Sequence, residues 1–91
     1  MRLDIFLKLS RLIPRRTLAQ EFLKKGLVSV NGVSAKAAKE ILVGDEIEIR
    51  RYDKVTKARV LIVPNGKQVS KKDSSTLAEI ISETKLETGI T

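Results

Sequence analysis

Residues 2–32 limit what this chain can fold into more than any other stretch: they read RLDIFLKLSRLIPRRTLAQEFLKKGLVSVNG. Apolar residues recur at helical spacing over most of this stretch, which predicts two short helices. The first helix is expected to run from Leu3 to Ile13, because the residue before a proline is pushed into extended backbone. We expect Pro14 in the first turn of the second helix, where its missing N–H costs nothing.

The second helix is expected to bury one apolar face and to end in a charged sequence. Leu18, Phe22 and Leu23 are predicted to point inward. The helix should end at residues 24–26, Lys-Lys-Gly, because cations favour the C-terminal end of the helix dipole and glycine can cap it in the left-handed conformation.

A β-hairpin is predicted directly after the second helix. Residues 28–30 alternate as a strand and residues 33–35 would return beside it. Asn31-Gly32 between them favours a type I′ turn, in which both residues have a positive φ. A polar connector or a single helical turn is expected at residues 36–40. The remaining predicted elements are a Gly44-Asp45 turn, a strand at 47–50, a charged turn at 52–57 and a strand at 58–63.

The composition changes after residue 63. Residues 67–75 are polar and are predicted to form a linker. Thr76 and Glu79 match a capping box, which predicts the start of a terminal helix. Its apolar stripe would hold Leu77, Ile80, Ile81 and Leu86. We therefore expect an α+β domain over residues 1–63, with two helices on a small, largely antiparallel sheet and a last strand. A polar linker and a short C-terminal helix are expected over residues 64–91.

The positive charge is concentrated in the predicted domain. Residues 1–63 hold 14 Lys and Arg against 7 Asp and Glu, whereas residues 64–91 hold 4 of each. A basic body with a neutral tail indicates a polyanionic partner, and the arginine fork binds phosphate through two hydrogen bonds. We therefore expect RNA binding. The candidate contact residues are Arg2, Arg11, Arg15, Arg16, Lys24, Lys25 and Lys36.

Each of these cations also has a plainer interpretation. Arg2 could pair with Asp4, Lys24 and Lys25 could serve only as helix C-caps, and Lys36 could belong to a solvated face. A second basic cluster could protect an edge strand from aggregation. It holds Arg50, Arg51, Lys54, Lys57 and Arg59.

The residue types argue against an enzyme. The chain has no cysteine and no histidine, which removes disulfides, thiolate chemistry, most zinc sites and histidine acid–base catalysis. Ser10 and Thr17 have no evident base to activate them. We therefore expect no catalytic residue, no metal and no cofactor. No apolar run approaches the ~20 residues of a membrane span, so a cytoplasmic protein without membrane contact is expected.

Aromatic residues are scarce, which bears on how RNA would be recognised. Phe6 and Phe22 lie in apolar stripes and are predicted to be core, so Tyr52 is the remaining candidate for stacking on a base. Readers of single strands use several aromatics. Recognition of the backbone and shape of folded RNA is therefore expected.

The order of these elements resembles the small RNA-binding module named after bacterial ribosomal protein S-four, over about residues 1–50. It consists of two helices, the hairpin Lys-Gly-x-Val-x-Val-Asn-Gly and a Val-Gly-Asp turn into an alternating strand. The opening RLDIFLKLSRLIPRRTLA is similar to the stand-alone members called RqcP, formerly YabO-type proteins. Arg2 and Arg16 match positions that the family uses on RNA, whereas Pro14 departs from its usual basic or small residue.

The resemblance implies a non-enzymatic factor of ribosome-associated quality control. Such proteins bind obstructed large (50S) subunits that still carry peptidyl-tRNA, and they support alanine tailing of the stalled chain by RqcH. The implied partners are large-subunit rRNA, peptidyl-tRNA and an RqcH-like factor, and a monomer is expected. Three alternatives stay open: a heat-shock-type factor that recycles large subunits, the RNA-binding module of an rRNA- or tRNA-modifying enzyme, and a DNA-binding protein.

Overall fold

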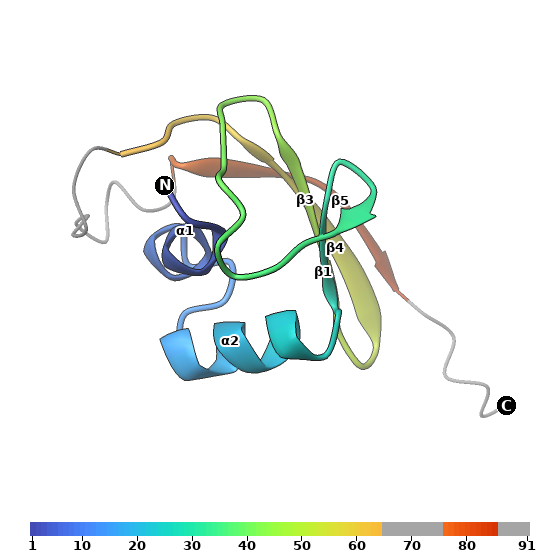
Figure 1. Ribbon diagram of the computed structural model, residues 1–91. Helices are drawn as coiled ribbons and strands as arrows, with labels where there is room; N and C mark the ends of the chain where they lie inside the picture. The colour runs from blue at the N-terminus through green and yellow to red at the C-terminus, as the bar shows by residue number, and fades with distance from the viewer. Residues whose placement is uncertain (65–75, 86–91) are drawn as a thin grey trace, which may run out of the picture.

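The computed structural model describes residues 1–64 and 76–85. Two helices pack against one face of a five-stranded antiparallel sheet (Figure 1). The helices are α1 (Leu3–Leu9) and α2 (Arg16–Lys24). The strands are β1 (Val28–Val30), β2 (Val33–Ser34), β3 (Glu46–Arg50), β4 (Lys54–Val60) and β5 (Ala78–Lys85). Their order in the sheet is β2-β1-β3-β4-β5, which confirms the predicted α+β class.

Helix α1 is shorter than the apolar pattern predicts. It ends at Leu9, and Arg11 then takes a left-handed φ of 61°, outside the helical range. Leu12 and Ile13 are nevertheless buried, and the N–H of Ile13 donates to the carbonyl of Leu7 at 3.1 Å. The apolar residues after Leu9 therefore belong to the core, as predicted, but they reach it from a loop.

Helix α2 begins two residues after Pro14, so the prediction of Pro14 inside the first turn is wrong. The helix packs mainly through Ala19 and Leu23, whose spacing of four places them on one ridge. Phe22 is half-buried against the core, as a predicted inward residue, but Leu18 is 38% exposed. Leu18 points outward because the close approach at Ala19 sets which face of the helix meets the core.

The hairpin after α2 follows its prediction closely. Gly26 has a φ of 74°, so it takes the left-handed conformation expected after the helix. Asn31 and Gly32 have φ values of 52° and 83° and join β1 to β2, with Val30 opposite Val33. The positive φ at both turn positions explains why this short sequence specifies the hairpin.

The C-terminal segment is a strand, and the predicted terminal helix is wrong. Residues 78–85 pair antiparallel with β4 along its whole length, with a register shift at Lys57/Ala58. β4 itself begins at Lys54, earlier than the predicted Ala58, because the turn before it is only a few residues long. The ladder offered by β4 outweighs the local capping-box pattern at Thr76. The predicted linker at 67–75 and Leu86 lie outside the described residues.

Candidate nucleic-acid interface

The N-terminal end of α2 has no side-chain cap and carries arginines at and before its first residue. The N-cap residue Arg15 makes no side-chain cap hydrogen bond, and the first turn contains no acidic residue. Arg16 is the first helical residue, and Arg11 lies in the loop before it. We call residues 10–15 the arginine loop. A helix start with uncapped N–H groups attracts anions through the helix dipole, and these guanidinium groups add to that attraction.

The start of α1 is closed by contrast. The N–H of Leu3 donates to the carbonyl of Lys39 at 2.8 Å, and the N–H of Asp4 donates to the carbonyl of Ala37 at 3.2 Å. The connector between β2 and β3 therefore covers the first turn of α1. Of the two described helices, α2 is the one whose start is accessible to a phosphate.

Five of the seven predicted contact residues are exposed and form no ion pair with a described residue. They are Arg11, Arg15, Arg16, Lys24 and Lys36. An exposed cation without a carboxylate partner can bind a phosphate without first breaking an internal pair.

Along α2, two cations and a glutamine lie on a face of the helix next to the buried ridge. Arg16, Gln20 and Lys24 are exposed and spaced by four residues, so they share one face of the helix. Lys25, just after the helix, pairs with Glu21 at 3.2 Å. Since both partners are largely exposed, this pair is weak and leaves Lys25 able to exchange partners.

Arg2 has a structural partner, because it pairs with Asp4. Its Nε lies 3.3 Å from Oδ1 of Asp4, whose side chain is fully buried. The side chain of Arg2 is itself 54% exposed. Arg2 therefore compensates a buried carboxylate and still presents part of its guanidinium to the surface.

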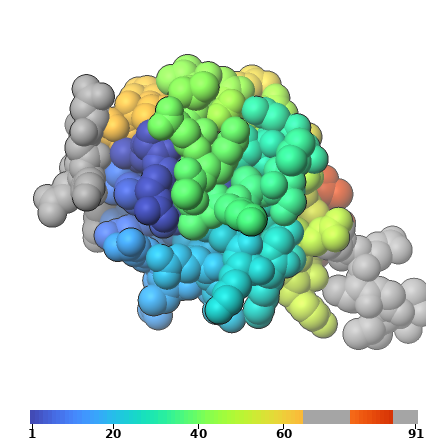
Figure 2. Space-filling model, in the orientation of Figure 1, coloured from blue at the N-terminus to red at the C-terminus, as the bar shows by residue number. Residues whose placement is uncertain are grey.

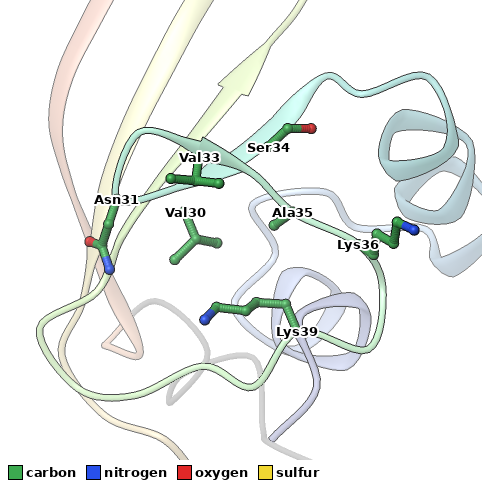
Figure 3. A pocket seen from close by; sticks show the side chains of 7 residues that line it. All are labelled: Val30, Asn31, Val33, Ser34, Ala35, Lys36 and Lys39. Atoms are coloured by element: carbon green, nitrogen blue, oxygen red, sulfur yellow. The ribbon is translucent and has the colours of Figure 1, made fainter.

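Lys36 lies in the connector beside the hairpin, at a pocket of about 460 Å³. Val30 and Ala35, both buried, form part of its lining. Figure 3 shows Lys39 extending along the pocket towards Asn31, whereas the amine of Lys36 points the opposite way. Lys39 was not among the predicted contacts, but it adds a second exposed cation to this side of the molecule.

The polar groups at the hairpin tip are used by the fold. Asn31 donates from Nδ2 to Oδ1 of Asp45 at 3.1 Å and accepts from the N–H of Glu46 at 3.0 Å. Asp45 also accepts from the N–H of Leu42 at 2.9 Å. The side chain of Asn31 thus holds two turns together.

Most of the second basic cluster is engaged within the fold. Lys54 pairs with Glu83 at 3.5 Å and Arg59 pairs with Glu46 at 3.2 Å. Arg51 donates from Nη2 to the carbonyl of Leu12 at 2.7 Å. In the described part of the chain, these partners hold the cations against the sheet and loop. Sequence reasoning missed them because the partners are far apart in the chain.

The elements that carry the predicted contacts adjoin one another. Figure 2 shows the start of the chain (dark blue), the connector (green) and α2 (light blue to cyan) as one continuous surface.

Neither described helix is long and apolar enough to cross a membrane. Within residues 1–64 and 76–85, no group of three His, Cys, Asp or Glu residues is placed to hold a metal ion. The continuous surface formed by the chain start, the connector and α2 carries exposed cations and can bind an extended anion.

Similarity to known proteins agrees with a nucleic-acid-binding role. The family model described as S4 domain matches residues 1–47. An RQC P-site tRNA stabilizing factor of Streptococcus pneumoniae is 42% identical over 90 residues, covering 99% of this chain and 100% of the relative.

Two solved structures share the fold. A solution structure of the hypothetical protein HP1423 is 34% identical, with a TM-score of 0.78, covering 90% of this chain and 98% of that one. The trimeric Heat Shock Protein 15 of Vibrio cholerae has a TM-score of 0.76 over 90% of this chain and 82% of that one. At 24% identity, this second likeness shows the fold alone. The chain belongs to the S4-domain family, in the group of the RQC P-site tRNA stabilizing factors.

Proposed function

We propose that this protein is a non-enzymatic RNA-binding factor that acts on obstructed large (50S) ribosomal subunits still carrying peptidyl-tRNA. It stabilises the tRNA in the P site while an RqcH-like factor adds an alanine tail to the stalled chain. The observation that carries the proposal is the open, arginine-rich start of α2 in a chain that matches an RQC P-site tRNA stabilizing factor along its whole length.

The contact residues act mainly on the phosphate backbone. Arg15 and Arg16 lie at the start of α2 and Arg11 in the loop before it, so the helix dipole and these guanidinium groups favour an anion on the same part of the chain. Lys24 extends this surface along the helix, and Lys36 extends it to the connector. Lys25 and Arg2 also contact phosphates, although Lys25 already pairs with Glu21 and Arg2 already pairs with Asp4.

Backbone recognition suits a partner of defined shape. Tyr52 is 88% exposed, but the other two aromatic side chains are wholly or partly buried, so the surface has no platform for stacking several bases. A folded RNA such as tRNA or an rRNA helix presents phosphates at fixed positions, which a rigid set of cations can match. The protein acts in the cytoplasm, as a monomer with one RNA-facing surface.

Co-sedimentation tests the binding step. Purified protein is mixed with vacant 50S subunits or with 50S subunits carrying P-site peptidyl-tRNA, and the subunit fractions of a sucrose gradient are probed. We expect retention on the tRNA-carrying subunits and weaker retention on vacant ones. Equal retention on 30S subunits, or preference for duplex DNA in a parallel filter-binding assay, would contradict the proposal.

A reconstituted tailing reaction tests the functional step. It contains obstructed 50S subunits, an RqcH-like factor and alanyl-tRNA, with or without this protein. We expect the alanine tail to lengthen when the protein is present, and the triple variant Arg11→Ala/Arg15→Ala/Arg16→Ala to reduce that gain. Tails of the same length without the protein would separate it from tailing even if it binds the subunit.

A further inference from the structure

The side chain of Arg51 joins the sheet to the arginine loop. Its Nη2 donates to the carbonyl of Leu12 at 2.7 Å, across 39 positions of sequence. Leu12 directly follows Arg11 and lies three residues before Arg15. The hydrogen bond therefore acts on the backbone that carries two of the proposed phosphate contacts.

Arg51 is firmly placed at its own end. Its N–H donates to the carbonyl of Lys54 at 2.8 Å, which closes the turn between β3 and β4. The N–H of the preceding Arg50 donates to the carbonyl of Leu27 at 2.8 Å. The guanidinium thus extends from a turn that backbone hydrogen bonds hold on both sides.

The environment of Arg51 fits a support better than an RNA contact. Its Nε is buried and has no hydrogen-bond partner in the described structure, so this polar atom is unavailable to a ligand. Its Nη2 is already used on Leu12. Arg50 is the opposite case, because it is exposed and forms no ion pair with a described residue.

The N–H groups of Ser10, Arg11 and Ile13 tie the arginine loop back to α1 at 2.9, 3.1 and 3.1 Å, but the side-chain hydrogen bonds within the loop are long. The hydroxyl of Ser10 donates to the carbonyl of Leu7 at 3.4 Å, and the N–H of Leu12 donates to that hydroxyl at 3.5 Å. Arg11 holds a φ of 61°, which a residue with a side chain rarely adopts. The charge-assisted bond from Arg51, at 2.7 Å, is shorter than these bonds within the loop.

We propose that Arg51 is a positioning residue, which holds the arginine loop in the conformation that presents Arg11 and Arg15 to RNA phosphate. It acts through the carbonyl of Leu12 and does not itself contact RNA. This inference rests on the proposed RNA-binding function and adds to it a link between the sheet and the RNA-facing loop.

A double-mutant cycle tests the proposal. Arg51→Met removes the donor and keeps most of the aliphatic stem, and Arg51→Lys keeps one donor. Arg50→Met is the matched control, since it removes the same charge from the adjacent, unpaired arginine. Each change is made in the wild type and in an Arg11→Ala/Arg15→Ala background. Affinity for a large-subunit rRNA hairpin is measured by fluorescence anisotropy, at a temperature where circular dichroism shows each variant folded.

Coupling between Arg51 and the loop arginines is the expected result. Arg51→Met should weaken binding about tenfold in the wild type but less than about twofold in the background, since interacting residues give non-additive effects. Arg51→Lys should recover most of the loss. Arg50→Met should cost the same factor in both backgrounds.

Other results would distinguish a failure of the Arg51 proposal from a failure of the proposed RNA-binding function. An equal loss for Arg51→Met in both backgrounds would mean that Arg51 contacts RNA directly, and no loss in either would mean that the loop holds itself; both overturn the proposal. If Arg11→Ala/Arg15→Ala bound as tightly as the wild type, the loop would not be part of the interface and there would be nothing for Arg51 to position. Loss of binding by Arg16→Ala in that case would still support the proposed function.

If Arg51→Met fails to fold, Arg51→Lys and amide exchange decide the matter. Exchange of the Leu12 and Ile13 amides is compared in the wild type and in Arg51→Lys. Faster exchange confined to this loop, together with weaker RNA binding, supports a positioning role. Unchanged loop exchange with weaker binding overturns it.

Discussion

The guanidinium of Arg2 lies against both carboxylate oxygens of Asp4, with Nε 3.3 Å from Oδ1 and Nη2 3.3 Å from Oδ2. The carboxylate is fully buried and also accepts the N–H of Ile5 at 2.9 Å. A carboxylate in this position needs a cation, because burying an unpaired charge is costly. Arg2 therefore has a structural task as well as its proposed contact with RNA.

We expect Arg2→Ala to lower the free energy of unfolding by about 1–3 kcal/mol, since it leaves a buried acceptor without its charged partner. RNA affinity should fall as well. The double variant Arg2→Ala/Asp4→Asn separates the two effects, because it removes the buried charge together with its partner. Thermal melts should show stability restored in the double variant while RNA binding stays weak. Recovery of binding along with stability would assign Arg2 to the fold alone.

Arg16→Ala should weaken RNA binding by about 1.5–3 kcal/mol without lowering the melting temperature, because one charge-assisted contact is lost and no internal pair breaks. Lys85→Ala is the control: it removes the same charge from the exposed end of β5, an edge strand of the sheet. Binding is measured by anisotropy on an rRNA hairpin and stability by thermal melts. Equal effects of the two variants would indicate that only net charge matters.

Arg11→Gly should dissociate stability from binding. Glycine adopts a φ near 61° without steric cost, so the melting temperature should stay the same or rise slightly. RNA affinity should still fall, by about 1.5–3 kcal/mol for a lost charge-assisted contact. Arg11→Ala gives the comparison, because it loses the same contact and keeps the strained φ. A large drop in stability for Arg11→Gly would show that the arginine side chain supports the loop.

The two phenylalanines should differ in their effect on stability, because burial differs. Phe6 is fully buried, so Phe6→Ala should cost about 3–5 kcal/mol of unfolding free energy. Phe22 is half-buried at the edge of the same core, so Phe22→Ala should cost clearly less, about 1–2 kcal/mol. Chemical denaturation of both variants measures the difference. An equal cost would mean that Phe22 is as well packed as Phe6.

Local patterns in the sequence were enough to predict the parts of the fold that depend on near neighbours. Helical periodicity placed both helices, and Asn31-Gly32 placed the hairpin because only a positive φ at both residues closes such a turn. The same logic failed at residues 76–79. There the capping-box pattern is compatible with a helix, but pairing with β4, in which Ala78 lies opposite Val60, stabilises a strand.

The sequence predicted which residues make up the candidate site, but not the hydrogen bonds that hold them in place. Exposed arginines near the start of α2 follow from charge and apolar spacing alone. The contacts that hold them do not, because Arg51 and Leu12 are 39 positions apart and the Asn31–Asp45 pair spans 14. No local signal marks such pairs. A cation in the sequence can therefore belong to the fold or to the interface, and only the geometry separates Arg51 from Arg50.

The salt dependence of RNA binding should reflect the number of uncommitted cations. If roughly four of them displace counterions from phosphates, the log–log slope of affinity against salt should be about −3 to −4. Raising the salt from about 50 to about 200 mM would then weaken binding on the order of a hundredfold.

Variants should change this slope one contact at a time. Arg16→Ala should reduce its magnitude by about 1, whereas Lys85→Ala should leave it unchanged. Scrambling the bases of the hairpin while keeping its shape should matter little, because A-form grooves hide base edges and Tyr52 is the one exposed aromatic side chain among the described residues. A shallow slope with strong sequence preference would contradict backbone recognition. It would place the RNA-reading surface away from α2.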